Sequence, residues 1–299
     1  MRTSFILCLL AMTSCWLTCC REKTSNASTV QVAAALPPVA HSAYVPKGYE
    51  IVWYDEFSGS KLDLKKWCFP TYKHRGAATM NSPGTVACKD DMLHLTTLWD
   101  KGQIHASYIS TRDRFEQKYG YYEARIKFQK LQGHHGAFWL QSRSFTKGVN
   151  DPAQYGTEMD IIEWFGDGRR KGWAGMHVYY NSKGRDGKAT RMRNLSWPTF
   201  HLMGGSYEGK EDEVIENLSG RFRVYGLLWT EKGCYFSCDG VEIMAEESIV
   251  SQVPQFIALS LLCENWERQR MQVEKLPDAM QVDYVRVYSP EKTKQEAVK

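Results

Sequence analysis

The strongest structural signal in this chain is a six-residue segment, Glu158-Met159-Asp160-Ile161-Ile162-Glu163. It places three acidic residues in a stretch that is otherwise apolar and strand-forming. Side chains on a β-strand alternate between faces, so Glu158 and Asp160 share one face while their apolar neighbours point into the body of the protein. Regular alternation would turn Glu163 to the opposite face. A β-bulge around Ile161-Ile162 would return it, and the segment then predicts three carboxylates in one row above an apolar floor.

Such a row suits retaining hydrolysis of a glycosidic bond, which needs a nucleophile and a second carboxyl that first donates and later accepts a proton. We assign Glu158 as the nucleophile, Glu163 as the acid/base and Asp160 as the partner that orients Glu158. Retaining carboxyls lie ~5–5.5 Å apart, whereas four pleat steps separate Cα atoms by roughly 13 Å. Both glutamates must therefore lean inward over the shorter Asp160.

An alternative interpretation is that the three acids simply face solvent on a half-exposed antiparallel strand. Two like charges side by side on one strand are unfavourable without a function, which favours the catalytic interpretation slightly. The surrounding sequence has to decide between the two.

Short strand-like segments, rich in β-branched and aromatic residues and separated by Gly, Asp, Asn and Pro, dominate the remaining sequence. No strand alternates with a long amphipathic helix, which argues against a βαβ architecture. The pattern predicts an all-β jelly-roll sandwich of two antiparallel sheets in one domain. The expected strands are Met92 to Thr97, Tyr121 to Phe128, Gly136 to Gln141, Gly175 to Tyr180, Phe222 to Thr230, Tyr235 to Cys238, Phe256 to Leu262 and Met280 to Tyr288.

The chain divides into four regions: a lipoprotein-type signal peptide at 1–20, a flexible tether at 21–45, the β-sandwich at 46–290 and a loose tail at 291–299. The signal segment holds four cysteines, and two of its runs are similar to bacterial lipoprotein processing sites. We expect export across the inner membrane and a lipid-anchored protein of the bacterial cell envelope. Ordinary cleavage that releases a soluble protein is the alternative. The four cysteines are Cys8, Cys15, Cys19 and Cys20.

Composition narrows the function. The hydrophobic content is 43% and the charged content 24%, as in soluble globular proteins. A formal net charge of +4 is too small to indicate nucleic-acid binding. Aromatic residues make up 13%, which suits a sugar-stacking surface as well as a core. Outside the signal segment an odd number of cysteines remains, so we expect mostly buried free thiols, with Cys68–Cys88 as a conceivable pair.

Further segments occur in an order that resembles glycoside hydrolase family 16 over nearly the whole span from Tyr49 to Ser289. The acidic segment is similar to the bulged E-x-D-x-x-E signature of laminarinases, agarases, porphyranases and carrageenases. The matching segments are Trp53-Tyr54-Asp55-Glu56-Phe57, Leu62-Asp63 with Trp67, Gly120-Tyr121-Tyr122-Glu123-Ala124-Arg125, Ala137-Phe138-Trp139-Leu140, Phe222 to Trp229 with Asp239-Gly240, and Val282-Asp283-Tyr284-Val285-Arg286-Val287-Tyr288.

The resemblance implies a concanavalin-like jelly roll with an open concave cleft and endo-acting retaining hydrolysis of β-1,3 or β-1,4 linkages. It implies that Trp139 stacks against a sugar and that His177 hydrogen-bonds near the acids. Trp173 and Trp266 are candidate sugar platforms, with core or rim packing as the alternative for each tryptophan.

The same resemblance implies no required cofactor. It does suggest a structural calcium ion held by Glu56 and Asp283, because hard oxygen ligands suit calcium. The expected partner is a polysaccharide or glycan substrate, bound by a monomer that meets the membrane only through its lipid anchor.

The substrate is left open by the sequence. Laminarinases often carry a Trp-Pro segment before the signature, whereas Asp151-Pro152-Ala153-Gln154-Tyr155-Gly156-Thr157 stands here. We therefore favour galactose-containing chains, either agar-type or poly-N-acetyllactosamine and mucin-type O-glycans. An endo-β-1,3-glucanase, a transglycosylase and a non-catalytic carbohydrate-binding jelly roll are the alternatives.

Overall fold

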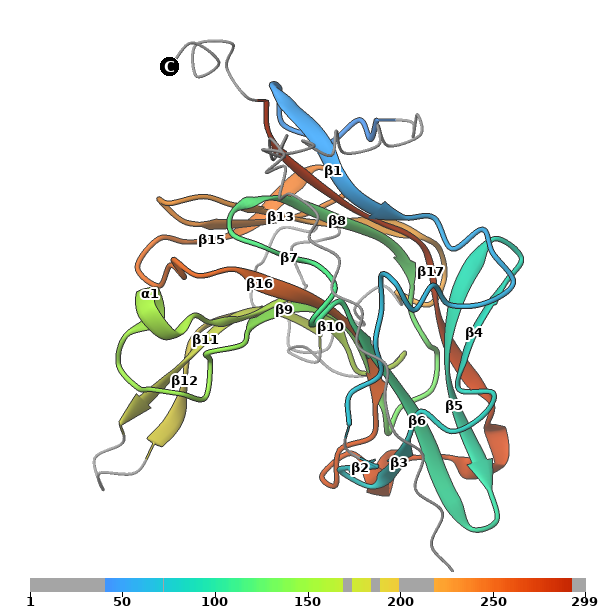
Figure 1. The fold of residues 1–299 in the computed structure, drawn as a ribbon. Helices are drawn as coiled ribbons and strands as arrows, with labels where there is room; N and C mark the ends of the chain where they lie inside the picture. Colours follow the sequence, from blue (N-terminus) through green and yellow to red (C-terminus); the bar gives the residue numbers. More distant parts are fainter. Residues whose placement is uncertain (1–40, 72, 169–173, 184–188, 199–217, 292–299) are drawn as a thin grey trace, which may run out of the picture. The chain divides into compact units, whose positions relative to one another are not determined.

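The computed structural model describes residues 41–71, 73–168, 174–183, 189–198 and 218–291. These residues form two layers of antiparallel β-sheet, as Figure 1 shows. The all-β sandwich expected from the sequence is therefore confirmed. Within this described part, no helix has the length and apolar character that a bilayer-spanning helix requires.

The first layer, sheet A, runs in the order β15, β14, β13, β8 and β17. Along the outer edge of β17, β5 pairs with its first part and β1 with its last part, and β4 lies beyond β5. Its strands are β1 (Tyr49–Asp55), β4 (Val86–Lys89), β5 (Met92–Asp100), β8 (Gly120–Lys127), β13 (Arg223–Trp229), β14 (Cys234–Cys238), β15 (Val241–Glu246) and β17 (Asp278–Pro290).

The second layer, sheet B, runs in the order β12, β11, β10, β9 and β16, with β6 and β7 along the outer edge of β16. Its strands are β6 (Gln103–Ser110), β7 (Glu116–Gln117), β9 (His135–Ser142), β10 (Glu158–Trp164), β11 (Ala174–Lys183), β12 (Ala189–Pro198) and β16 (Gln255–Leu262). The acidic segment is thus an interior strand of this sheet.

Three short helices and a small hairpin complete the described structure. The helices are α1 (Pro152–Tyr155), between β9 and β10, and the 3-10 turns η2 (Arg268–Arg270) and η3 (Val273–Lys275). The hairpin consists of β2 (His74–Arg75) and β3 (Ala78–Met80), and β3 pairs in parallel with β6. Gly76 in this hairpin has φ +56° and lies so close to the Cys263 carbonyl that a Cβ would collide with it.

The main core fills the space between the sheets. Four apolar residues of β10 enter it, and Met159, Ile161, Ile162 and Trp164 are all fully buried there. Trp164 is therefore a core residue, as its place after Glu163 predicts. Burying an aromatic side chain of this size contributes about 3–5 kcal/mol, judged by the cost of truncating one to alanine.

The cysteines of the described region are unpaired. Cys88, Cys234, Cys238 and Cys263 are buried free thiols and Cys68 is a partly exposed one, so no Cys68–Cys88 disulfide forms. Burial raises the pKa of the Cys88 thiol to about 11, with the Asp55 carboxylate adding to the effect. The four signal-segment cysteines lie outside the described residues.

Candidate active site

The expected bulge is present in β10. On the β9 side, Asp160 pairs with Trp139 and Ile162 with Phe138, so Ile161 is the additional residue. The register with β11 shifts over the same stretch. This irregularity changes which face the end of the strand presents.

The bulge returns Glu163 to the acidic face. Glu163 lies opposite Ala137, and Asp160 lies opposite Trp139. Ala137 and Trp139 are two residues apart on a regular strand and share a face, so their partners do as well. Glu158, Asp160 and Glu163 line one hollow together, as the acid row requires.

The three carboxylates differ in environment. Glu158 and Asp160 are 6% and 5% exposed, while the Glu163 side chain is 18% exposed. The side-chain amide of Gln141 on β9 donates a hydrogen bond to Glu158 Oε2. An amide that donates to a carboxylate favours its charged form, which is the form a nucleophile needs.

Two imidazoles flank Glu163. His177 Nε2 lies 3.4 Å from Glu163 Oε2, and His135 Nε2 lies 3.8 Å from Oε1. His177 occupies the place that the family resemblance implies, on β11 directly opposite Asp160. Its ring lies over Gly175, where a Cβ would overlap the imidazole. Glycine at this position therefore makes room for the histidine beside the acid.

Trp139 forms the floor of the cleft between the acids and the outer strands. Its indole N–H donates to Ser260 Oγ on β16 at 3.1 Å. Its ring stacks with Tyr108 on β6, with 5.4 Å between centroids and 29° between planes. The tryptophan is only 6% exposed, so a small part of a fixed ring faces the cleft.

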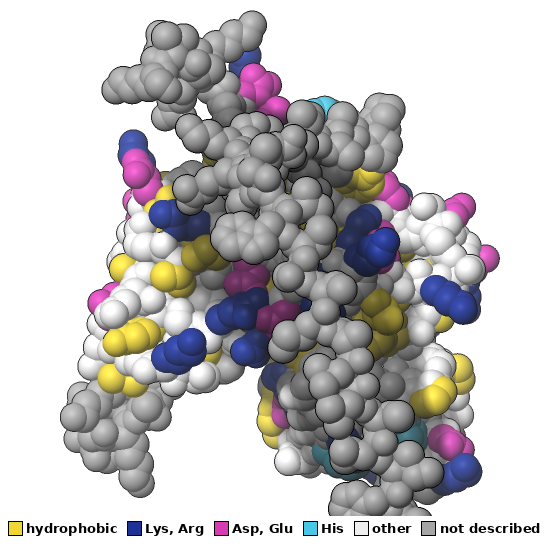
Figure 2. Space-filling model, in the orientation of Figure 1, with side chains coloured by type: hydrophobic (Ala, Val, Ile, Leu, Met, Phe, Trp, Pro, Cys, Tyr) yellow, Lys and Arg dark blue, Asp and Glu magenta, His cyan; other side chains and the backbone are white. Residues whose placement is uncertain are grey.

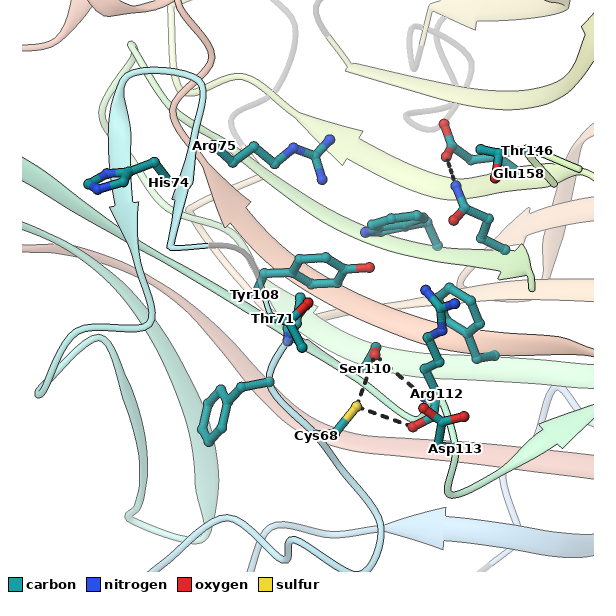
Figure 3. A pocket seen from close by; sticks show the side chains of 15 residues that line it. Cys68, Thr71, His74, Arg75, Tyr108, Ser110, Arg112, Asp113, Thr146 and Glu158 are labelled. Atoms are coloured by element: carbon teal, nitrogen blue, oxygen red, sulfur yellow. Dashed lines mark hydrogen bonds between the residues drawn. The ribbon is translucent and has the colours of Figure 1, made fainter. Parts of the chain in front are cut away.

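Two adjoining hollows make up the cleft. The first hollow, of about 690 Å³, runs from Phe69 and Arg112 to Glu158. The second, of about 400 Å³, holds the acid row and ends at Trp266. Arg75, Trp139 and Glu158 line both, so the nucleophile candidate lies where the two hollows meet. Figure 3 shows Arg75 extending over the first hollow toward Glu158, while His74 points away from it.

Trp266 is 50% exposed and lies at the end of the second hollow, where it lines the cleft beside Phe165. The two rings are 5.6 Å apart. An exposed tryptophan in this position can stack against a sugar. Trp173, the other flanking candidate, lies outside the described residues.

Charge on the molecular surface is mixed. Figure 2 shows basic and acidic side chains interspersed over one face, with apolar ones scattered between them. Arg75 itself is ion-paired with Glu264, with 3.1 Å between Nε and Oε1. The cleft therefore combines charged pairs with aromatic rings, as a polar polymer ligand requires.

Glu56 and Asp283 do not fit the calcium site that the resemblance implies. Both oxygens of Glu56 accept hydrogen bonds from Arg286, each at 2.8 Å. Asp283 pairs with Arg125 at 2.6 Å. Guanidinium groups neutralise both carboxylates and repel a cation. Over the described ranges, no group of three or more His, Cys, Asp or Glu side chains could hold a metal ion.

Three residues of the site were not identified from the sequence: His135, Gln141 and Arg75. A signal existed for the first two, because His135, Ala137, Trp139 and Gln141 alternate along one strand and must share the face of Trp139. No sequence signal pointed to Arg75, because its hairpin reaches the cleft only through tertiary packing.

Comparison with known proteins places this geometry in a family. Residues 53–290 match a family model described as "Beta-porphyranase A-D, GH16 domain". Glucan endo-1,3-beta-glucosidase A1 of Niallia circulans is 24% identical over 81% of this chain, and kappa-carrageenase of Pseudoalteromonas carrageenovora is 28% identical over 78%. Keratan-sulfate endo-1,4-beta-galactosidase of Sphingobacterium multivorum is 24% identical over 47% of the chain.

These matches span 38%, 62% and 36% of the lengths of the three relatives. Among solved structures, a laminarinase from Flavobacterium sp. UMI-01 shares the fold, with a TM-score of 0.61 and 21% identity. That likeness covers 80% of this chain and all of the laminarinase chain. The family model covers most of the chain and includes the whole acid row, so the chain belongs to glycoside hydrolase family 16.

Proposed function

We propose that this protein is a retaining endo-β-glycanase that cleaves internal β-1,3 or β-1,4 linkages of extracellular polysaccharides or long glycans. The observation that carries the proposal is the bulge in β10, which brings Glu163 into the same hollow as Glu158. A regular strand would leave only one of the two glutamates in the cleft. Double displacement needs both.

In the first step, Glu158 attacks the anomeric carbon while Glu163 gives its proton to the departing glycosidic oxygen. The glycosidic C–O bond breaks and a covalent ester to Glu158 forms. In the second step, Glu163 takes a proton from a water molecule that attacks the same carbon and releases Glu158. Asp160 lies between them on the strand and restricts how the Glu158 carboxyl can turn.

The cleft supplies contacts for several sugar units. Trp139 is held rigidly by Ser260 and Tyr108 below the junction of the two hollows. Trp266 offers a broad exposed ring at one end. Apolar C–H faces of a sugar pack well against such rings. His177 acts next to Glu163 rather than on a distant sugar.

We further propose galactose-containing chains as the substrate. The family model is one of β-porphyranases, and one relative is named a keratan-sulfate endo-1,4-β-galactosidase. These names agree with the departure from the laminarinase sequence pattern before β10. An endo-β-1,3-glucanase is the second candidate, supported by the Niallia circulans relative.

Reducing-end release on three purified substrates tests the proposal: a β-1,3-glucan, an agar-type galactan and a poly-N-acetyllactosamine glycan. We expect hydrolysis of at least one galactose-containing chain, and NMR of early products should show retained β-configuration. Glu158→Gln serves as the matched inactive protein. Hydrolysis of the glucan alone would replace the galactan assignment, and cleavage of none of the three would refute the glycanase assignment.

We also propose that the protein is exported and carries a lipid on one of the four cysteines of the signal segment. The support is the sequence of residues 1–20 and the proline-containing tether that follows. Metabolic labelling with a radioactive fatty acid tests this. Labelled protein that loses its label only when the acylated cysteine is replaced by serine would identify the site.

A further inference from the structure

The acid/base candidate lies between two histidines of different strands, and only one of them is explained by the family. His177 approaches one oxygen of Glu163 from β11, and His135 approaches the other from the start of β9. The family resemblance gives no role to His135, which has its own surroundings.

Aromatic rings enclose His135. Its imidazole stacks on Phe165, with 4.7 Å between centroids and 19° between planes. Trp266 lies nearly parallel to it at 6.4 Å and 24°. The residue is 6% exposed. Water therefore has little access to the ring, and the ring has little freedom to turn.

The two ring nitrogens of His135 have different neighbours. Nδ1 is buried and has no hydrogen-bond partner among the described residues. Nε2 points toward the Glu163 carboxyl at 3.8 Å. In a neutral ring one nitrogen carries the proton, and the favourable place for it is the nitrogen that faces an acceptor. The arrangement thus assigns the proton to Nε2.

The surroundings also keep the ring uncharged. Burial, followed by the positive charge of Arg75 and the neighbouring His134, lowers the pKa of His135 to about 3. The ring is therefore neutral around pH 7. The ionisable groups around it are Arg75 from β2, His134 beside it, Glu163 from β10, His177 from β11 and Glu264 after β16.

We propose that His135 is a positioning residue that sets the pH at which Glu163 releases its proton. It offers the carboxylate one neutral N–H, which stabilises the charged form modestly. A cation in its place would hold the carboxylate ionised and remove the acid, while an apolar group would favour the protonated form. A donor that is neutral around pH 7 lets Glu163 alternate between acid and base. This inference rests on the proposed function of the acid row.

Three substitutions test it. His135→Gln keeps a neutral N–H donor at similar reach, His135→Phe keeps the aromatic stack without a donor, and His135→Lys introduces a cation. The alkaline limb of the kcat/KM profile reports loss of the acid's proton in the free enzyme. We expect His135→Gln to leave the alkaline limb in place. We expect His135→Phe to move the limb to higher pH, and His135→Lys to move it to lower pH by about 1 unit or more.

A second measurement does not depend on turnover. In the Glu158→Gln background, the infrared C=O band of the protonated Glu163 carboxyl, identified by its loss in Glu163→Gln, is followed against pH. The pH midpoint of this band should be lowest in the His135→Lys variant. It should be higher and equal with His or Gln at position 135, and highest in the His135→Phe variant. His134→Gln is the matched control, because that histidine contacts Thr97 and Asp278 instead of Glu163.

The outcomes separate the two claims. If the infrared midpoint of Glu163 and the alkaline limb of kcat/KM are the same in all folded variants, the role of His135 is overturned. This holds even if kcat falls equally in all of them. If the Lys variant does not fold, the difference between Gln and Phe still decides. A carboxyl series in the expected order, from a protein that cleaves no glycan, would support this inference and refute the proposed function.

Discussion

The two glutamates of the acid row have the same side chain and different neighbours. Glu158 accepts a hydrogen bond from Gln141, whereas Glu163 lies between His135 and His177. A donated hydrogen bond favours the ionised form of a carboxyl. The neutral imidazole of His135 permits both forms. The residue environments therefore agree with a fixed anion at one position and a proton carrier at the other.

Replacing Glu158 by glutamine should reduce turnover by at least about 10⁴-fold, because the amide cannot form the covalent intermediate. Folding should be unaffected, since the amide is isosteric with the carboxyl. Initial rates and circular dichroism spectra of the two proteins measure both effects. Glu158→Gly with added azide should regain activity and yield a glycosyl azide of inverted configuration. Full activity in Glu158→Gln would contradict the assignment.

Gly175→Ala tests whether the space below His177 matters for catalysis. The added methyl would overlap the imidazole and push it away from Glu163. We expect kcat/KM to fall about tenfold, which corresponds to ~1.4 kcal/mol of transition-state stabilisation. The substituted residue itself makes no contact with the substrate in this scheme.

A double-mutant cycle with His177→Asn provides the control for Gly175→Ala. Once the histidine is gone, the alanine should cost little further activity. An undiminished tenfold loss in the His177→Asn background would mean that the alanine acts through another part of the structure.

At the scale of the strand, the bulge decides which residues of β10 face the cleft. Deleting Ile161 should restore regular pairing with β9, and Glu163 should stay opposite Ala137 on the cleft face, because it then stands four residues after Glu158. We expect activity to be retained within about tenfold. The melting temperature should fall, because the deletion removes a fully buried isoleucine from the core. Glycanase assays and thermal unfolding measure the two effects.

Ile161→Val is the matched control for this deletion. It keeps the bulge and removes one buried methyl group, at a cost of about 0.5–1.5 kcal/mol in stability with activity retained. A deletion variant that folds but loses hydrolysis altogether would show that the bulge does more than bring Glu163 to the cleft face.

The elements show what the sequence could and could not predict. Strands such as β10 and β16 follow from apolar runs and turn residues, and the bulge followed from the chemistry that three acids would need. The period of two on β9 would also have placed His135 and Gln141 in the cleft. Arg75 and its hairpin could not be placed, because their contact with Cys263 and Glu264 joins segments far apart in the sequence.

For a related reason, Glu56 and Asp283 do not fit the expected calcium site. Glu56 and Asp283 have the right chemistry for calcium, but arginines from β17 and β8 take both carboxylates. A residue type indicates which ligands are possible, and its neighbours in space decide which are bound. Arg286 is far from Glu56 in the sequence, and Arg125 is far from Asp283, so the sequence did not indicate these pairs.

Over the whole domain, two sheets pack around one apolar core, and sheet B bears the cleft on its other face. The described cysteines are free, so packing and hydrogen bonds hold this part together without disulfides. A rigid sheet that is buried on one side gives the acids fixed backbone positions. The cleft can then vary through its hairpin and loops without loss of the fold.

The size of the cleft predicts how activity depends on substrate length. Hollows of about 690 and 400 Å³ meet at Glu158, so a bound chain extends to both sides of the bond that is cleaved. On the polysaccharide that the enzyme cleaves, viscosity should fall early, before many reducing ends appear. With defined oligosaccharides, kcat/KM should rise with length until both hollows are filled.

The two ends of the cleft can be probed separately. Trp266 lies at the end of the second hollow and Phe69 at that of the first, with 50% and 42% of their surfaces exposed. Trp266→Ala should raise KM for long oligosaccharides by about tenfold, the loss expected for one stacked ring. It should leave the shortest cleavable substrate almost unchanged, because that substrate does not reach the tryptophan. Phe69→Ala is the matched variant for the other end. Equal losses for substrates of all lengths would mean that Trp266 stabilises the site rather than binding sugar. Release of only terminal sugar units by the unmodified enzyme would refute internal cleavage.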